Sequence, residues 1–212
     1  MGVRHRLFVA IYDRMNAAAE RRWMGKRRAN LLADAHGVVL EIGGGTGANL
    51  PYYRDVERLV IAEPDPFMRK KLRPKLAQAH VPVEVSDADA QRLPFADESF
   101  DAVVFTLVFC TIPDPQAALM EIRRVLRPAE GRLLFLEHVR GEGKVARWQD
   151  RVQPLWSWMA AGCHPNRDTV ATVEATSFQV EKLERFEPPV PLSAFAPCVQ
   201  GTACLAEGAA TP

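Results

Sequence analysis

Short, mostly apolar segments alternate with amphipathic segments between residues 38 and 139 of the chain. Five of the apolar segments have the length and continuity expected of strands that are covered on both faces. They are Val38–Ile42, Arg58–Ala62, Val81–Val85, Asp101–Phe105 and Arg132–Val139. This alternation predicts an α/β fold, a doubly wound sheet of parallel strands with helices on both faces.

Local signals mark the ends of two connecting helices. Asp114 can cap a helix that Pro128 stops, and the apolar face of this helix is formed by Leu119, Ile122, Val125 and Leu126. A second helix is expected over Pro66–Ala79, with Asp65 as its cap and a kink at Pro74. Both helices follow a strand, as the predicted fold requires.

The pattern becomes less regular beyond residue 139. We expect a tryptophan-rich helix over Lys144–Ala161 and a further helix over Asp168–Thr176. Two more strands are expected over Val180–Phe186 and Ala196–Ala203. Residues 206–212 are expected to fray.

Charge changes this picture in one region. The 212 residues carry a formal net charge of +1, so no overall field favours nucleic acid. Residues 4–28, however, hold eight basic residues against two acidic ones, together with Leu7, Phe8, Ile11, Met15 and Trp23. Such a basic amphipathic helix suits a position on anionic lipid or over a pocket. A solvated charged face with its apolar stripe on the core explains the same pattern and is the favoured interpretation.

The cysteines give no sign of a metal site. All four are scattered along the chain, with no Cys-x-x-Cys pair and no histidine at metal-ligand spacing: Cys110, Cys163, Cys198 and Cys204. Free thiols in a reducing cytoplasm explain them. No apolar run is long enough to span a bilayer, and the N-terminus lacks the apolar core of a signal peptide. A cytoplasmic location is therefore expected.

A glycine-rich stretch, residues 40–47 (Leu-Glu-Ile-Gly-Gly-Gly-Thr-Gly), follows the first expected strand. Gly43, Gly45 and Gly47 lack Cβ atoms, so the backbone there can turn sharply and approach a ligand. A helix after the loop would offer unpaired N–H groups. Taken alone, the stretch also fits a dinucleotide-binding loop, because Gly43, Gly45 and Ala48 satisfy Gly-x-Gly-x-x-Ala.

Three acidic residues separate these two interpretations. Glu41 puts a carboxylate beside the loop, where it favours a cationic amino-acid group and repels a pyrophosphate. Glu63 ends the second strand and can accept from both hydroxyl groups of a ribose. Asp89 follows the third strand and can accept from an adenine amino group, while the Ala90 backbone meets the ring edge. Together they favour a cofactor that joins an amino acid to adenosine.

These features, in this order, resemble the class I S-adenosylmethionine-dependent methyltransferases (methyltransferase type 11). The resemblance rests on Glu-x-Gly-x-Gly-x-Gly, the acid after strand two, Asp-Ala-x-x-Leu-Pro-Phe, Ser99-Phe100-Asp101 and Val125-Leu126-Arg127-Pro128. It implies a seven-stranded sheet with a reversed C-terminal hairpin, with S-adenosylmethionine across the carboxyl ends of the first four strands. The turn after Pro128 departs from the usual Arg-Pro-Gly-Gly, on the side far from the cofactor.

The acceptor side needs groups that position a nucleophile and take its proton. His138 is the favoured base because its pKa suits proton transfer near neutral pH, and a positioning role in the pocket wall fits equally well. Glu137 and Asp150 are the other catalytic candidates, and Cys110 is expected to be an inert buried thiol. Further residues could form a lid, although tryptophan and methionine at helical spacing more often belong to the core: Trp148, Trp156, Trp158, Met159, Cys163 and His164.

A closer resemblance, to the methyltransferase-like seven group, covers nearly the whole chain. It rests on residues 40–49, Glu63-Pro64-Asp65-Pro66, residues 106–110, residues 137–139, Trp148-Gln149 and Gly162-Cys163 followed by Arg167. These are thiol S-methyltransferases of membranes and lipid droplets, which implies a small, lipophilic thiol as acceptor. Glu63 matches an Asp that this group uses for the cofactor, and Asn49, Pro64, Thr106 and Leu107 are further expected cofactor-binding residues.

The membrane anchor is the main departure from that group. This chain starts with only a short basic amphipathic helix, so we expect at most reversible membrane-surface contact through residues 4–28. We expect a single methyltransferase domain over residues 1–212. It comprises the helical segment 1–36, a cofactor-binding core over 37–139, and acceptor-pocket helices with the last strands over 140–212.

The expected reaction is in-line transfer of a methyl group from S-adenosylmethionine to a thiol sulfur. No nucleic acid, metal or obligate protein partner is expected. A phospholipid or quinone methyltransferase fits the same features. An NAD-dependent oxidoreductase is disfavoured by Glu41 and Asp89, and a non-catalytic cofactor-binding scaffold is disfavoured by the intact glycine loop with both cofactor carboxylates.

Overall fold

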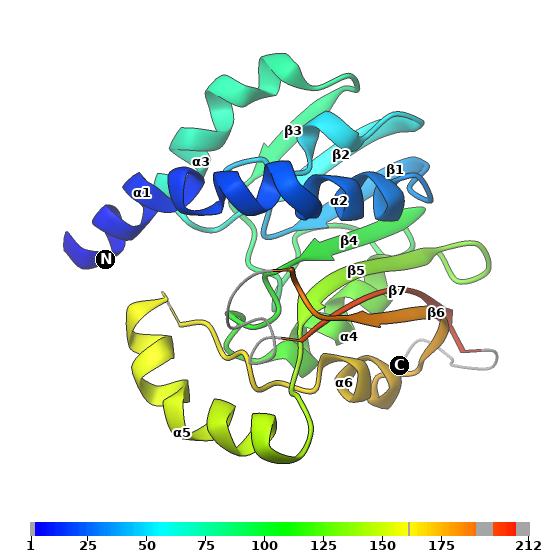
Figure 1. Ribbon diagram of the computed structural model, residues 1–212. Helices are drawn as coiled ribbons and strands as arrows, with labels where there is room; N and C mark the ends of the chain where they lie inside the picture. Colours follow the sequence, from blue (N-terminus) through cyan, green and yellow to red (C-terminus); the bar gives the residue numbers. More distant parts are fainter. Residues whose placement is uncertain (1–2, 161, 190–196, 207–212) are drawn as a thin grey trace.

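Seven strands form one sheet in the order β3-β2-β1-β4-β5-β7-β6, and β7 runs against its two neighbours (Figure 1). The computed structural model describes residues 3–160, 162–189 and 197–206. Its strands are β1 Gly37–Ile42, β2 Val56–Ala62, β3 Val83–Ser86, β4 Ala102–Thr106, β5 Arg132–His138, β6 Phe178–Phe186 and β7 Cys198–Leu205. The doubly wound α/β prediction and its reversed C-terminal hairpin are confirmed.

The strand order changes direction between β1 and β4, which pair in parallel from Val39 opposite Ala102 to Ile42 opposite Phe105. The connections on the two sides of this point leave in opposite directions, so the carboxyl ends of the strands border a crevice. Most predicted strands agree with the structure to within about two residues. The expected strand over Ala196–Ala203 begins outside the described residues, and β7 extends to Leu205.

Helices and single turns connect the strands. They are α1 Val3–Ala19, a π-helical turn η1 Glu20–Met24, α2 Gly25–Leu32, the 3₁₀ turns η2 Leu50–Tyr52 and η3 Arg73–Gln78, α3 Pro66–Leu72, α4 Pro115–Val125, α5 Gly143–Met159 and α6 Thr169–Ala175. The expected kink at Pro74 is confirmed as the change from α3 to η3. Both predicted caps are confirmed: Asp65 Oδ1 accepts from Phe67 N at 2.7 Å, and Asp114 Oδ1 accepts from Ala117 N at 3.0 Å.

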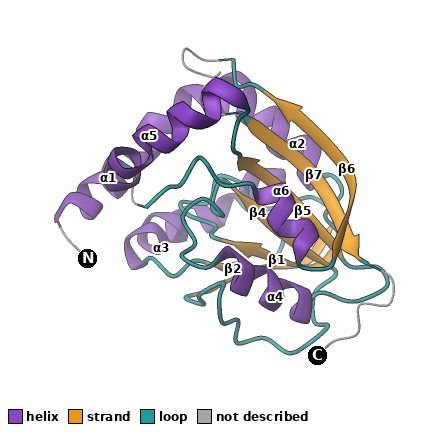
Figure 2. Ribbon diagram, turned by 90° about the horizontal axis from the view of Figure 1, so that it is seen from below, coloured by secondary structure: helices purple, strands orange, loops and turns teal. Residues whose placement is uncertain are grey.

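Alternate residues of the central strands belong to two apolar layers, one on each face of the sheet. In β4, Val103 and Phe105 pack with α4 and α6, whereas Ala102 and Val104 pack with α2. Figure 2 shows α4 and α6 on one side of the sheet and α2 on the other. Burial on both faces explains why these strands are continuously apolar in sequence.

Helices α1 and α5 differ from this pattern because neither packs its large apolar residues in the two layers. In α5 only Ala146 and Gln149 are buried, and Trp156 and Trp158 are 47% and 59% exposed. The expectation that the tryptophans belong to the core is therefore wrong. Among the described residues, no helix combines the length and the apolar character needed to cross a membrane.

The cap of α4 yields a test of local stability. Asp114→Ala removes the acceptor for two backbone N–H groups, and we expect the free energy of unfolding to fall by about 1 kcal/mol. Asp114→Asn keeps an acceptor oxygen and is expected to stay within about 0.5 kcal/mol of the parent. Urea unfolding followed by circular dichroism measures both changes. Equal losses in the two variants would show that the cap is not the stabilising contact.

Candidate active site

A cavity of about 940 Å³ opens at the carboxyl ends of the central strands. Its floor comes from the ends of β1, β2, β4 and β5 and the loops that follow them, and residues of α1 and α5 line its outer part. Figure 1 shows these two helices on opposite sides of the edge where the parallel strands end. The volume lies within the range of sites that hold a small ligand, up to about 1,000 Å³.

The glycine loop forms one wall of this cavity, and its backbone lies close to the segment that follows β4. Gly43 has φ +64°, and its N–H donates to the carbonyl of Ala62 at 2.7 Å. A Cβ at Gly43 would lie 2.1 Å from Cγ2 of Val108, the residue that follows the end of β4 by two positions. Only glycine satisfies both the dihedral angle and this contact. The loop thus fits against both β2 and the segment after β4.

Glu63 is fixed beside the loop by backbone donors. Its carboxylate accepts from Gly45 N at 2.8 Å and from Asp65 N at 2.9 Å. Burial raises the pKa of Glu63, although the two backbone hydrogen bonds oppose this effect. The side chain is 7% exposed and lines the cavity, so a ligand with hydroxyl donors could supply the hydrogen bonds that water would otherwise provide.

Glu41 lies beneath the loop in a fully buried network. Its carboxylate accepts from Asn49 Nδ2 at 3.0 Å and from the Tyr53 hydroxyl at 2.9 Å. Burial raises the pKa of Glu41 to about 7, against the opposing influence of Tyr53, Arg28 and Asn49. A cationic group in the cavity would therefore stabilise the ionised form of Glu41.

Arg28 extends this network to β4. Arg28 is 5% exposed, and its guanidinium donates at 2.7 Å to both Asn49 Oδ1 and Thr106 Oγ1. A second set of donors holds Glu20 at 3.0–3.3 Å. Arg28 and Tyr53 were missed by sequence reasoning, since Arg28 lies among basic residues and nothing local distinguishes it from a solvated side chain.

Helix α1 crosses the glycine loop and is tied to it. The carboxylate of Asp13 accepts from Thr46 Oγ1 at 2.5 Å and from Lys75 Nζ at 3.1 Å. The apolar side chains of α1 face the cavity and the solvent at its mouth: Leu7, Phe8, Ile11, Tyr12 and Met15. The favoured interpretation of residues 4–28, an apolar stripe on the core, is wrong for α1, whereas Trp23 in the turn after α1 does pack against the core. The alternative position over a pocket is confirmed.

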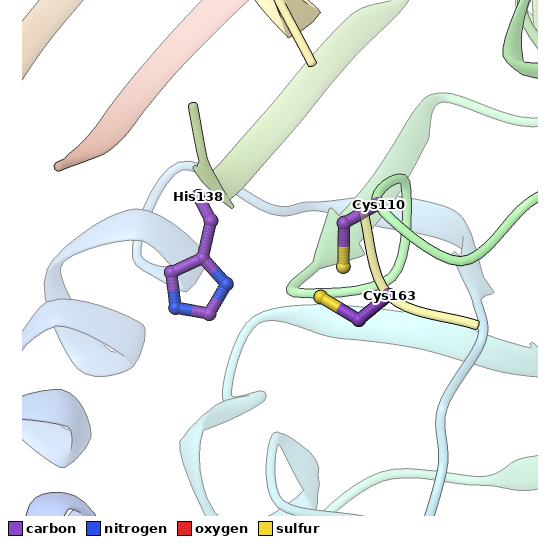
Figure 3. Close-up of side chains that lie close together, drawn as sticks. All are labelled: Cys110, His138 and Cys163. Atoms are coloured by element: carbon purple, nitrogen blue, oxygen red, sulfur yellow. The ribbon is translucent and has the colours of Figure 1, made fainter. Parts of the chain in front are cut away.

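The other end of the cavity holds two thiols and an imidazole. Cys110 follows β4, His138 ends β5 and Cys163 follows α5, and their nitrogen and sulfur ligand atoms all lie within 4.8 Å of one another. Figure 3 shows one ring nitrogen of His138 turned toward the two sulfur atoms. The hydrogen bond with Cys110 lowers the pKa of Cys163, and His138 lowers it further. The same hydrogen bond, together with burial, raises the pKa of Cys110.

The turn that carries Cys110 is fixed from two sides. Glu137 Oε1 accepts from Val108 N at 2.7 Å and from Phe109 N at 3.0 Å. From the loop after α5, His164 N donates to the Cys110 carbonyl at 2.7 Å, and Arg167 donates to the carbonyls of Phe109 and Ile112. Burial raises the pKa of Glu137 to about 7. Because Glu137 binds two N–H groups of the turn and does not line the cavity, it supports the turn from beneath.

The remaining expected site residues divide into two sets. Those that line the cavity are Gly45, Asn49, Pro64, Asp89, Ala90, Thr106 and Leu107. Gly47 does not line it, and at φ +83° it shapes the turn against Leu50 and Leu72. Asp150 also lies outside, where it forms a two-pronged ion pair with Arg140 at 2.6 Å. The structure does not bring Asp150 to the cavity, so it supplies no proton acceptor there.

Comparison with known proteins identifies what this architecture resembles. Residues 40–135 match the family model described as "Methyltransferase domain". The thiol S-methyltransferase TMT1B of Homo sapiens is 37% identical over 171 residues, which cover 78% of this chain and 69% of TMT1B. The thiol S-methyltransferase TMT1A of Homo sapiens is 31% identical over 201 residues, which cover 92% of this chain and 82% of TMT1A.

Other relatives match shorter parts of the chain or share only its fold. A phosphatidylethanolamine N-methyltransferase of Cereibacter sphaeroides is 34% identical over 113 residues, covering 52% of this chain and 55% of that protein. A ubiquinone/menaquinone C-methyltransferase of Shewanella oneidensis is 31% identical over 147 residues, covering 66% of this chain and 56% of that protein. The solved S-adenosylmethionine-dependent methyltransferase of Thermotoga maritima superimposes with a TM-score of 0.63 at 23% identity, covering 95% and 99% of the two chains.

The glycine loop yields a test that separates steric fit from backbone strain. Gly43→Ala places a Cβ against Val108 at a position whose φ is +64°. We expect this substitution to lower the free energy of unfolding by about 2–4 kcal/mol. Gly143→Ala has a comparable φ of +51° but nothing within 4 Å of its Cβ, and it should lose only about 1 kcal/mol. Chemical unfolding of the two variants measures the difference. Equal losses would contradict the close approach of Gly43 to Val108.

Proposed function

Because this chain belongs to the S-adenosylmethionine-dependent methyltransferases, in the group of the thiol S-methyltransferases TMT1A and TMT1B, we propose that it methylates the sulfur of a small lipophilic thiol. The names of these two relatives support the acceptor class. The chemistry of the cavity wall supports it independently, because the two ends of the cavity differ in charge.

The cofactor end has the groups that S-adenosylmethionine requires, and this cofactor supplies an electrophilic methyl group on a sulfonium. Glu41 would hold its cationic amino acid, Glu63 the ribose hydroxyls and Asp89 the adenine amino group. The glycine loop removes side chains along the same wall, where a Cβ at Gly43 would occupy the space of Val108. With Asp65, four carboxylates line this end, which matches a ligand that carries positive charge and several donors.

The acceptor end has a different character. Among the described cavity-lining residues, the carboxylates come from β1, from the segment between β2 and α3 and from the loop after β3: Glu41, Glu63, Asp65 and Asp89. The lining contributed after β4, after β5 and by α5 has none, and its large members include Val108, Trp156 and Met159. A neutral apolar acceptor fits this end better than a cationic amine, which would lack a partner for its charge.

His138 lies at this end, and we propose that it promotes the loss of the acceptor's proton. An ordinary thiol has a pKa of about 8.5, so a modest aid suffices to ionise it near neutral pH. The apolar lining keeps water from the reacting atoms, while the fixed turn after β4 orients the wall against which the acceptor rests. Holding the two reactants in line is the main task that remains.

The single observation that carries this proposal is the carboxylate-free acceptor end with His138 in its wall. The test measures S-adenosylhomocysteine release by the purified protein with alkyl thiols, aryl thiols, quinols and lipid amines. Each thiol is compared with the alcohol of the same carbon skeleton. We expect release with the thiols and none with the matched alcohols. Release with quinols or lipid amines alone would overturn the thiol assignment while leaving the methyltransferase assignment intact.

A lipid or quinone acceptor is the second candidate. The matches to a phosphatidylethanolamine N-methyltransferase and a ubiquinone/menaquinone C-methyltransferase favour it, as do the apolar side chains at the mouth of the cavity. Both matches cover less of the chain than the matches to the thiol S-methyltransferases. The carboxylate-free wall argues against an amine headgroup at the reacting position.

We also propose that this protein is cytoplasmic and touches membrane surfaces reversibly through residues 4–28. Leu7 and Met15 of α1 are 62% and 59% exposed beside the basic residues of the same helix. Leu7→Glu with Met15→Glu should reduce co-sedimentation with anionic vesicles, because it removes apolar area and adds negative charge. The matched control is Met120→Glu, at an exposed methionine of α4. Equal sedimentation of both variants would contradict the proposed contact.

Glu63 yields a test of the cofactor end. Glu63→Ala removes a charge-assisted acceptor, and we expect S-adenosylmethionine binding to weaken by about 1–3 kcal/mol. Glu63→Asp keeps the carboxylate and should lose less. Glu57→Ala, at an exposed position on β2, is the control with no expected effect. Isothermal titration calorimetry measures all three, and unchanged affinity in Glu63→Ala would show that the ribose is held elsewhere.

Glu41 yields a prediction about pH. Its pKa of about 7 in the free protein means that a cationic ligand must displace a proton below this pH. S-adenosylmethionine affinity should therefore fall by up to about tenfold per pH unit below about pH 7. Glu41→Gln removes the titrating group and should flatten this profile. A pH profile by calorimetry that is the same in both proteins would contradict the role of Glu41.

A further inference from the structure

Three side chains that the sequence separates widely form a compact donor set in the cavity wall. Cys110, His138 and Cys163 each offer one ligand atom, and these atoms lie within 4.8 Å of one another (Figure 3). All three residues line the cavity. The donors are two sulfurs and one imidazole nitrogen, a combination preferred by Zn²⁺ and other soft or borderline ions.

The size of the cluster suits a single ion. Zinc binds sulfur at about 2.3 Å and imidazole nitrogen at about 2.0 Å, so ligand atoms around one ion lie about 3.5 Å apart. The observed limit of 4.8 Å is therefore larger by about 1 Å, which small side-chain rotations can remove. One ring nitrogen of His138 is turned toward both sulfurs in Figure 3, as a shared ion requires.

The backbone around the cluster is fixed independently of any ion. The loop of Cys163 is held to the turn of Cys110 by His164 N, which donates to the Cys110 carbonyl at 2.7 Å. Arg167 donates to the carbonyl of Ile112 at 2.6 Å, and Glu137 binds the same turn from below. Two cysteine ligands are thus positioned before an ion arrives, which reduces the ordering cost of binding.

The number of ligands indicates what kind of metal site this is. Structural zinc sites have four protein ligands, whereas catalytic sites have three and keep one position open. Here three donors lie in the wall of a cavity, and no carboxylate lines the parts of the described cavity wall contributed after β4, after β5 and by α5. The open position would therefore face the space in which the acceptor binds.

We propose that Cys110, His138 and Cys163 bind one Zn²⁺ ion and that the acceptor's sulfur takes its fourth position. The second half of this proposal rests on the proposed thiol substrate. A thiol that binds the ion displaces a water molecule and releases its proton to solvent, so His138 promotes this ionisation as a ligand of the ion and not by accepting the proton itself. The sulfur lone pair then forms the new bond to the methyl carbon while the methyl–sulfonium bond breaks, and its electron pair stays on the sulfonium sulfur. The neutral thioether is a weak ligand and leaves.

The first experiment tests the metal site without turnover. The full chain is stripped with a chelator under reducing conditions and titrated with Co²⁺, which reports thiolate ligation by a charge-transfer band and four-coordinate geometry by its visible bands. We expect saturation at one ion per chain. Cys110→Ser, Cys163→Ser and His138→Ala should weaken binding by at least about 100-fold. Cys204→Ser, at a partly buried thiol of β7, is the matched control and should bind as the parent does.

A second measurement guards against variants that fold poorly. In the parent protein, Zn²⁺ should protect two thiols from alkylation and from peroxide, and Cys110 and Cys163 should be the protected pair by mass spectrometry. If no saturable cobalt band appears, or if Cys204→Ser loses it equally, the metal site is overturned. A Cys110–Cys163 disulfide that forms with peroxide even in the presence of excess Zn²⁺ would overturn it in favour of a redox pair.

The third measurement separates this inference from the proposed function. An alkyl thiol added to the cobalt protein without S-adenosylmethionine should shift the visible bands, and the matched alcohol should not. Bands that the thiol leaves unchanged would overturn the open position. Thiol methylation at the full rate by metal-free protein would overturn the zinc proposal and support the thiol acceptor. A thiol-dependent shift with no methylation of any thiol would support the metal site and overturn the proposed acceptor.

Discussion

A buried guanidinium joins the parts of the chain that form the cavity floor. Arg28 of α2 donates to Glu20 in the π-helical turn, to Asn49 after the glycine loop and to Thr106 at the end of β4. A charge that is 5% exposed is tolerated only when its partners are all in place, because an unpaired one costs several kcal/mol. The N-terminal segment is therefore part of the site, and the geometry of the glycine loop depends on it.

The features that could be predicted from sequence are those with local causes. The strands were recognisable because both faces are buried, and the caps at Asp65 and Asp114 because a side chain bonds its own helix. The cluster of Cys110, His138 and Cys163 has no local cause. It forms only because β4 and β5 are neighbours and the loop after α5 returns to the turn after β4. No spacing rule for metal ligands covers such a set.

Amphipathic patterns predicted the helices but not their surroundings. An apolar face shows that a helix has something to contact, and the core is the usual contact. In α1 the apolar side chains meet the cavity mouth instead, as do Trp156 and Met159 of α5, and Leu7 and Trp156 remain 62% and 47% exposed there. For α1 the difference follows from the hydrogen bond of Asp13 to Thr46, which ties the helix to the glycine loop and away from both apolar layers.

The division of the cavity into a carboxylate end and an apolar end has a consequence for the proposed chemistry. Attack of a thiolate on a sulfonium removes one negative and one positive charge, so the transition state is less polar than the reactants. Surroundings of low polarity stabilise such a change more than water does. The carboxylates then serve to bind the cofactor's fixed amino-acid and ribose groups, whereas the apolar end both selects the acceptor and favours loss of charge. An amine acceptor would form a new cation at that end and gain no such advantage.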